Sequence, residues 1–327
     1  MDENISKENN DKKEKKNSNS NFVNIKSKYI LKKIFEFLLT KKSFEIIKHN
    51  KIIKSLLEIS INSYKEYSEL EIEIILAKNK FGNFINLSEK NEKYFQIFFD
   101  KNKKDIKKYS INKKDLIKKI KVITTHKFAK SKSLQLFKNC ECIESISLKC
   151  YRNIFNNISN MFRNCSSLKK IEFIHFNIEN IHDISYMFAE CKSLEIINFS
   201  DFNTENVTDM NSLFYDCKSL KRLNLLNFKT QNVTDMSYMF FCCESLKELN
   251  ILNFNTENVS DMGYMFFNCK SLMTVNFSNF RIIDNTRVRG MFTGCLREFQ
   301  NKIKALNKNI DDGEFIDDMN LMENLLD

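Results

Sequence analysis

One stretch recurs along the second half of the chain, and its clearest copy is MFFCCESLKELNI at residues 239–251. Every copy carries a cysteine in register. The first two are 25 residues apart and the others 26: Cys140, Cys165, Cys191, Cys217, Cys243, Cys269 and Cys295. A fixed period of about 20 to 50 residues is typical of solenoids, in which each unit stacks on the next and buries a shared core. The sequence therefore predicts a stacked repeat domain over residues 136–296, with about six units.

The residues after each register cysteine are expected to form a short parallel strand. In the copy at residues 219–225, Leu220, Leu223 and Leu225 have the spacing of inward-facing side chains, and Arg222 and Asn224 fall on the other face. Neighbouring strands lie about 4.8 Å apart, so identical positions of successive units form ladders. One buried ladder is expected from the phenylalanines Phe176, Phe202, Phe228, Phe254 and Phe280.

A short helix is expected on the opposite side of each unit. Thr234 is a good N-cap residue, and Asp235 follows it where the helix dipole favours a negative charge. The helix would span Asp235–Phe241 and bury Met236, Met239 and Phe240. One strand and one helix in each 26-residue unit predict an α/β solenoid.

Three further ladders are expected to be structural. The register cysteines suit tight internal turns as small apolar side chains, and zinc would require closely paired ligands. A second ladder could suggest a calcium site, but helix capping explains it better: Asp183, Asp209, Asp235 and Asp261. A third is expected to bond backbone groups: Asn180, Asn206, Asn232 and Asn258. The chain also lacks a Gly-rich phosphate loop and a recurring His, so we expect no catalytic residue, no metal and no cofactor.

The halves of the chain differ in charge. Residues 1–135 carry 32 Lys and Arg against 17 Asp and Glu, whereas residues 136–327 carry 20 against 25. We therefore expect separate domains: a disordered tail at 1–20, a helical module at 21–130, the solenoid at 136–296, and a C-terminal cap with an acidic tail at 297–327. Within the helical module, an amphipathic helix is expected from Ile30, Leu31, Ile34, Phe35 and Leu38.

A strongly basic run occupies residues 101–121. It could bind nucleic acid or acidic lipid, or it could be a solvated helix face. The solvated face is favoured, because the run contains no Arg, the residue that grips phosphates and bases best.

The N-terminus lacks the apolar core of a secretory signal, and no apolar run reaches the roughly 18 residues of a membrane-spanning helix. These features predict a cytoplasmic protein whose ten cysteines are reduced thiols. Surface display is the alternative if the true N-terminus is missing.

Two segments resemble known families. The repeat, best matched at residues 203–220 and 255–272, resembles BspA-type leucine-rich repeats, which implies a curved α/β solenoid and protein or matrix binding. Residues 25–60 more weakly resemble an F-box, in which the helix from Tyr29 to Leu38 would dock on a Skp-type adaptor through Ile30, Leu31, Ile34, Phe35 and Leu38.

The predicted function is non-enzymatic binding of a protein partner on the exposed strand face. That face has a first column of variable residues, Lys170, Ile196, Arg222, Glu248 and Thr274. Its second column is dominated by Asn: Glu172, Asn198, Asn224, Asn250 and Asn276. The mixed charges favour a protein over nucleic acid. The alternatives are an F-box-like substrate adaptor of a ubiquitin ligase and a surface adhesin.

Overall fold

The computed structural model separates the chain into two compact units, 1–68 and 69–327. It describes parts of the second unit: residues 70–102, 104–124, 135–150, 155–176, 178–199, 202–275, 281–283 and 285–306. The F-box-like segment 25–60 and the predicted tail 1–20 lie outside these residues, so those predictions stay untested.

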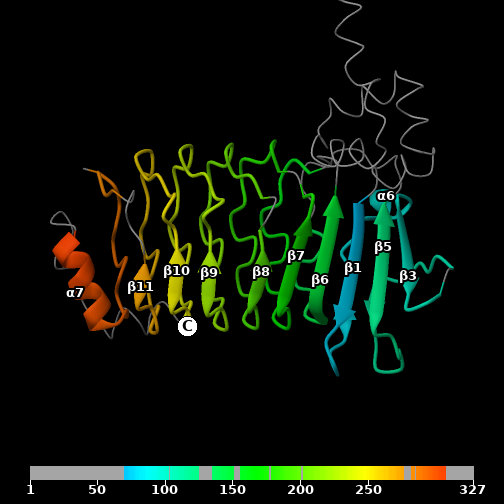
Figure 1. Ribbon diagram of the computed structural model, residues 1–327. Helices are drawn as coiled ribbons and strands as arrows, with labels where there is room; N and C mark the ends of the chain where they lie inside the picture. Colours follow the sequence, from blue (N-terminus) through cyan, green and yellow to red (C-terminus); the bar gives the residue numbers. More distant parts are fainter. Residues whose placement is uncertain are drawn as a thin grey trace, which may run out of the picture. The chain divides into compact units, whose positions relative to one another are not determined.

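Eleven β-strands and two helices are described, and the strands follow one another along the unit (Figure 1). Residues 70–124 contain β1 (Leu70–Leu76), β2 (Gly82–Asn83), α6 (Glu89–Glu92), β3 (Phe95–Phe99), β4 (Ser110–Ile111) and β5 (Lys119–Thr124). The repeats contain β6 (Ile143–Cys150), β7 (Lys170–Ile174), β8 (Ile196–Asn198), β9 (Arg222–Asn224), β10 (Glu248–Asn250) and β11 (Thr274–Val275), followed by α7 (Arg297–Leu306).

The strands form a six-stranded sheet in the order β3-β5-β1-β6-β7-β8, a three-stranded sheet in the order β11-β10-β9, and the pair β2-β4. From β3 to β6 the neighbours are antiparallel, and from β6 onward they are parallel. The six-stranded sheet therefore joins two regions at β6. We call residues 70–124 the strand cap and the stacked 26-residue units the coils.

The strand cap corrects the predicted helical module at 21–130 over the residues that the structure describes. In β1, Leu70, Ile72 and Ile74 are buried and alternate with the partly exposed Glu71 and Glu73. This period of two is that of a strand with one buried face. Residues 70–124 therefore extend the sheet of the first coil, in a range where a helical module was predicted.

The strand side of the coils agrees with the predicted register. Leu220, Leu223 and Leu225 are buried, while Arg222 and Asn224 are exposed. Equivalent positions pair in parallel, with Arg222 opposite Glu248 and Leu223 opposite Leu249. The predicted ladder of Phe176, Phe202, Phe228 and Phe254 is buried as expected, and Phe280 lies outside the described residues.

The opposite side of each coil is a run of tight turns, and the predicted helix Asp235–Phe241 is wrong. Tyr238 and Cys242 have left-handed backbones, with φ of 56° and 54°. The amides of Phe241 and Cys243 bond within the run, to the carbonyls three residues earlier. The amides of Tyr238, Phe240 and Cys242 instead bond the carbonyls of the next coil, at 2.9, 2.9 and 2.8 Å. We call this run the turn side.

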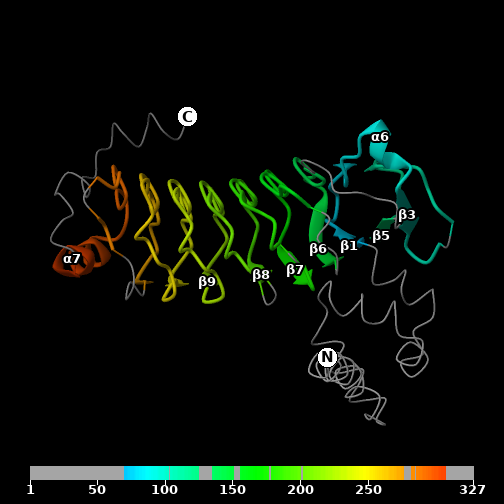
Figure 2. The same ribbon diagram turned by 90° about the horizontal axis from the view of Figure 1, so that it is seen from above.

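The N-cap role of Thr234 is also wrong, because its hydroxyl donates to the Thr208 carbonyl of the preceding coil at 3.2 Å. The cap of the turn is Asp235, whose Oδ1 accepts from the amide and hydroxyl of Ser237 at 2.8 and 2.6 Å. The fold is therefore a β-solenoid with little helix in the described residues. Figure 2 shows the coils from above as flattened loops that stand side by side.

Phenylalanine and cysteine ladders fill the core behind the turn side. Phe214, Phe240 and Phe266 stack almost parallel, with centroids 5.7 and 5.5 Å apart. Beside them, the Cys243 thiol donates to the Phe214 carbonyl at 3.2 Å, and the same bond recurs from Cys165 to Cys295 at 2.9 to 3.2 Å. The predicted packing role of these buried cysteines is therefore confirmed.

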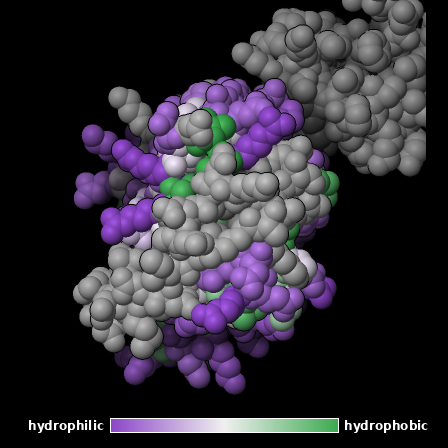
Figure 3. Space-filling model, turned by 90° about the vertical axis from the view of Figure 1, so that its left-hand side faces the viewer, coloured by the Kyte–Doolittle hydropathy of each residue, from purple (hydrophilic) through white to green (hydrophobic). Residues whose placement is uncertain are grey.

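Helix α7 ends the stack by replacing contacts that a further coil would supply. Gln300 Nε2 donates to the Phe292 carbonyl at 3.0 Å, which is the bond that a cysteine thiol makes elsewhere. Phe299 packs edge-on against Phe292, with centroids 5.9 Å apart. A C-terminal cap was predicted at 297–327; α7 occupies the described residues of this range, and the rest of the prediction lies outside the described residues. Figure 3 looks onto this end and shows small hydrophobic areas among hydrophilic residues.

Candidate functional site

The strand face carries exposed side chains in its first column. The Arg222 side chain is 77% exposed, the Glu248 side chain 54%, and Ile196 55%. Lys170 and Thr274 are exposed as well. Strand register places Lys170 opposite Ile196 and Arg222 opposite Glu248. The predicted first column is thus a row of unlike side chains on a repeated backbone.

Ion pairs along this column leave its charges open to solvent. Arg222 Nη2 lies 3.1 Å from Glu248 Oε1, and Lys170 Nζ lies 3.7 Å from Glu172 Oε2. Exposed pairs of this kind contribute about 0–1 kcal/mol. A partner could therefore displace them at little cost.

The second column is partly committed to its own backbone. Asn224 Oδ1 accepts from the Leu226 amide at 3.1 Å, and Asn250 Oδ1 accepts from the Leu252 amide at 3.4 Å. These asparagines shape the turn that follows the strand, a role that asparagine favours. Glu172 is half-buried and Asn198 exposed, while Asn276 lies outside the described residues. The first column is therefore the more adaptable of the two.

The structure extends the strand face over the strand cap, which the sequence analysis missed. Ser145 of β6 lies opposite Lys170, and Ser147 opposite Glu172. Beyond β6, β1 contributes Glu71 and Glu73, which pair across the sheet with lysines of β5: Lys121 at 2.5 Å and Lys119 at 2.8 Å. The alternation in residues 70–76 was the available signal.

A second surface feature that the sequence analysis missed is an aromatic cluster on the outside of the turn side. Tyr215, Phe241 and Phe267 stack in a row, with centroids 4.7 and 4.8 Å apart. Tyr238 and Tyr264 stack beside them at 5.1 Å. Burial raises the pKa of Tyr215 to about 12. The rings cover one another's faces, so this cluster stabilises the turn side. Its phenylalanines are fully buried, and only its tyrosines are partly exposed.

The remaining ladders are structural, as predicted. Asn232 Nδ2 donates to the Glu205 carbonyl at 2.7 Å, and Asn206 and Asn258 repeat this bond. In the aspartate ladder each carboxylate caps its own turn, and the ladder ends on Asn157 at 2.9 Å and Arg287 at 3.5 Å. In the part of the chain that the structure describes, no group of three or more His, Cys, Asp or Glu is placed to hold a metal ion.

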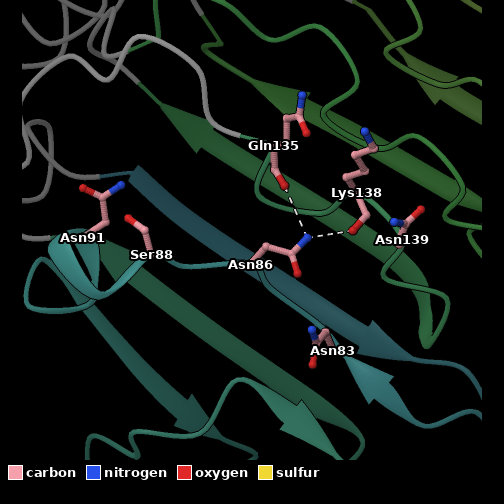
Figure 4. Close-up of a pocket in the computed structure, with 7 residues that line it drawn as sticks. All are labelled: Asn83, Asn86, Ser88, Asn91, Gln135, Lys138 and Asn139. Atoms are coloured by element: carbon pink, nitrogen blue, oxygen red, sulfur yellow. Dashed lines mark hydrogen bonds between the residues drawn. The ribbon is translucent and has the colours of Figure 1, made fainter.

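A polar cavity of about 450 Å³ lies where the strand cap meets the first coil (Figure 4). Asn86 Nδ2 crosses it and donates to the carbonyls of Gln135 and Lys138, at 3.3 and 2.7 Å. The other lining residues are Asn83, Ser88, Asn91 and Asn139. The lining offers amides, the Ser88 hydroxyl and one amine for hydrogen bonds, but no carboxylate or imidazole that could act as a general base for that hydroxyl.

A family described as "Mycoplasma protein of unknown function, DUF285" matches residues 133–248 and 220–322. The chain belongs to this family. The DUF285 match covers the coils and α7 and begins after the strand cap. The predicted likeness to BspA-type repeats concerns the same coils.

No curated protein matches this DUF285 chain. A crystal structure of a leucine rich cell surface protein from Faecalibacterium prausnitzii is similar to it at 19% identity, with a TM-score of 0.29, over 50% of this chain and 46% of that one. The chain thus spans about half the length of the solved structure that it matches. Among the described residues, no helix is long and apolar enough to cross a membrane, and the predicted cytoplasmic location stays a prediction.

Proposed function

We propose that this protein is a non-enzymatic interaction module that binds a protein partner on the first column of its strand face. One observation carries the proposal: the inward position of each strand is aliphatic from coil to coil, whereas the exposed first-column position beside it changes its chemical character. Ile171, Leu223 and Leu249 are all buried and aliphatic. Their first-column neighbours are a cation in Lys170 and Arg222 and an anion in Glu248.

A protein partner fits the chemistry of this column better than nucleic acid. A nucleic-acid surface needs a basic stripe, because phosphate contacts dominate its affinity. Here a cation, the exposed apolar Ile196, a second cation, an anion and a hydroxyl follow one another. Such alternation suits a protein surface with complementary charges around an apolar contact.

The proposal is tested with photo-crosslinking in the cells that make the protein. A crosslinker at position 196 should capture a defined protein, whereas one at position 192, at the corner after the turn side, should not. With the purified partner, Lys170→Asp with Arg222→Asp should weaken binding at least about tenfold, as expected when interface hot spots are lost.

The matched control carries the same charge change elsewhere. Lys192→Asp with Lys270→Asp also replaces two exposed cations, and both lie where coils turn toward the strand. This control should bind the partner like the natural protein. Crosslinks only from position 192, or equal binding by the two double variants, would overturn the strand face as the binding surface.

The adaptor alternative concerns residues 25–60, which lie outside the described residues, and it stays a prediction. Ile34→Asp in the full-length protein should abolish binding of a Skp-type adaptor, because an unpaired carboxylate in an apolar interface is strongly disfavoured. The coils should keep their stability in this variant. If the natural full-length protein does not bind a Skp-type adaptor, the adaptor alternative is wrong.

A further inference from the structure

Three loops of the strand cap meet at one end of the strands of the six-stranded sheet, where β1 and β3 end and β5 begins. We call this rim of strand ends the edge. The three loops are the β1–β2 turn at 77–81, the start of the β3–β4 loop at 100–104, and the β4–β5 loop at 112–118. The Leu76 amide bonds the Lys118 carbonyl at 3.0 Å, and the amides of Lys118 and Lys119 bond Asp100 Oδ1 at 3.2 and 3.0 Å. Figure 1 shows the lower ends of β1 and β5 at this edge.

The acidic groups of these loops are engaged in internal contacts. Asp100 accepts from the backbone amides just described. Asp105 accepts from the Ile97 amide at 2.9 Å and pairs with Lys107 at 3.0 Å. Asp115 pairs with Lys108 at 2.6 Å, and this hydrogen bond lowers the pKa of the carboxyl. These carboxylates are therefore engaged within the protein, Asp105 and Asp115 by lysines and Asp100 by backbone amides.

Lysines dominate what these loops expose to solvent. Seven of them are exposed: Lys78, Lys80, Lys101, Lys104, Lys113, Lys114 and Lys118. The exposed Glu141, just before β6, adds one negative charge nearby. The net result is a basic edge formed by segments far apart in the sequence.

Two large apolar side chains protrude among the lysines. Leu116 is 93% exposed and Phe81 is 40% exposed. Gly82 pairs with Ile111, so Phe81 lies close to the start of the loop that carries Leu116. A single exposed leucine is common in proteins, but a pair ringed by lysines on adjoining loops is a more specific pattern.

The Leu116 loop is held in shape by hydrogen bonds. Asp115 Oδ2 accepts from the Asn112 amide at 2.7 Å, and Asn112 Oδ1 accepts from the Lys114 amide at 2.9 Å. On the other side of Leu116, Ile117 packs against the core. The loop is thus anchored on both sides of its exposed leucine, which points away from the protein.

We propose that this basic edge docks on the surface of an anionic lipid bilayer, with Leu116 and Phe81 entering the interface. Lysines near an anionic membrane are attracted to its surface potential, and apolar side chains between them add burial at the headgroup boundary. Nucleic acid fits less well, because residues 77–118 contain no Arg and the most exposed apolar side chain, Leu116, is aliphatic and cannot stack on bases. The structure thereby favours the lipid alternative for the basic run at 101–121.

The test is vesicle binding by the full-length protein. Vesicles of phosphatidylcholine with about 30% phosphatidylserine should bind it, pure phosphatidylcholine vesicles should not, and binding should fall between about 0.1 and 0.5 M salt. Lys113→Glu with Lys114→Glu should lower the affinity at least about tenfold, and Leu116→Ser by about threefold or more. The control Lys221→Glu with Lys247→Glu makes the same charge change on the strand side and should bind as before.

Insertion of the loop into the bilayer is measured separately by the fluorescence of an introduced tryptophan, because the natural chain contains no tryptophan. Leu116→Trp should show a blue-shifted emission on the anionic vesicles, and Leu296→Trp near α7 should not. The proposal is overturned if the position 113 and 114 variant binds these vesicles like the natural protein, or if Leu116→Trp shows no shift. It is equally overturned if the natural protein binds an oligonucleotide through these lysines and ignores the vesicles.

Discussion

The strand side and the turn side of each coil both hydrogen-bond to the next coil, but they use their residues differently. On the strand side two to five residues pair between neighbouring coils, as in Glu248–Asn250, and alternate side chains face solvent. On the turn side every second amide reaches the next coil while the amides between them close turns. On the turn side nearly every residue is therefore held by a backbone hydrogen bond. On the strand side the first column faces solvent, so its residues can vary.

The difference teaches where stability and recognition reside in this solenoid. The turn side carries the stacked phenylalanines, the thiol bonds and two left-handed positions in each coil, such as Tyr238 and Cys242. The strand side carries the unlike first-column residues. Substitutions on the turn side should unfold the coils, and those in the first column should alter binding without loss of fold.

The largest expected effect is that of Phe240→Ala. This fully buried ring stacks between Phe214 and Phe266, so its removal should lower the free energy of unfolding by about 3–5 kcal/mol. Arg222→Ala in the first column should change it by less than about 0.5 kcal/mol. Denaturant titration measures both, and similar losses would break the proposed division between the two sides.

A smaller loss is expected from Cys217→Ala. The buried thiol donates to the Phe188 carbonyl at 3.1 Å, and alanine removes both this bond and the packed sulfur. The free energy of unfolding should fall by about 1–2 kcal/mol. Lys218→Ala, at the neighbouring partly exposed position, is the control and should have a smaller effect in the same titration. A neutral Cys217→Ala would show that the thiol ladder merely fills space.

The strand side was predictable because its pattern has one interpretation. The alternation of Leu223 with Arg222 and Asn224 fits a strand, and the 26-residue period aligns the strands in register. The first column of the candidate site follows from the same alternation. Its second column was harder to interpret, since the turn of Asn224 toward the Leu226 amide depends on backbone geometry beyond the strand.

The turn side was mispredicted because Met236, Met239 and Phe240 also have helical spacing. The left-handed backbone at Tyr238 and Cys242 excludes a helix, and neither tyrosine nor cysteine is a residue type that indicates a left-handed backbone. The same two columns do signal it in other coils, where Asn164, Gly290 and Gly294 also have positive φ. A comparison across coils could therefore have found the turns. In the strand cap, by contrast, the exposure of Leu116 depends on the contacts of Asp115 and could not be predicted from the sequence.

Ser212→Gly distinguishes a left-handed turn from a helix, because it should raise the free energy of unfolding in a turn and lower it in a helix. Ser212 is buried in the same column as Tyr238, with φ of 53°. In a helix, glycine would destabilise by about 1 kcal/mol. In a left-handed turn it relieves a strain of about 1–2 kcal/mol, which exceeds its entropic penalty. We expect a gain of about 0.5–1 kcal/mol in the free energy of unfolding.

The reverse change in that column is Gly290→Ala. Its new Cβ would lie 2.6 Å from the Tyr264 ring, at a φ of 61°, so this variant should be destabilised. Thermal unfolding of the two variants compares them directly. If Ser212→Gly lowered the unfolding temperature and Gly290→Ala raised it, the turn side would have to be helical, as first predicted.

The smallest effect is expected at Asp209, in the ladder of aspartates between the two sides. Burial raises the pKa of this carboxyl, the Asn211 amide opposes the shift, and the neighbouring Asp183 and Asp235 add to it. A folded-state pKa above the unfolded value means that the ionised carboxylate disfavours the fold. This penalty is present at neutral pH and disappears as the pH falls through the folded pKa toward the unfolded value.

Asp209→Asn removes the charge and keeps an oxygen for the Asn211 amide, which Asp209 Oδ1 accepts at 2.8 Å. The variant should therefore be slightly more stable at pH 7, within about 0.5 kcal/mol, and the advantage should vanish in acid as the natural carboxyl becomes protonated. Unfolding titrations of both proteins from neutral to acidic pH measure the difference. A destabilised variant at pH 7 would mean that the carboxylate charge strengthens the capping bond more than burial and its neighbours oppose it, and the ladder would then belong with the turn side as a source of stability.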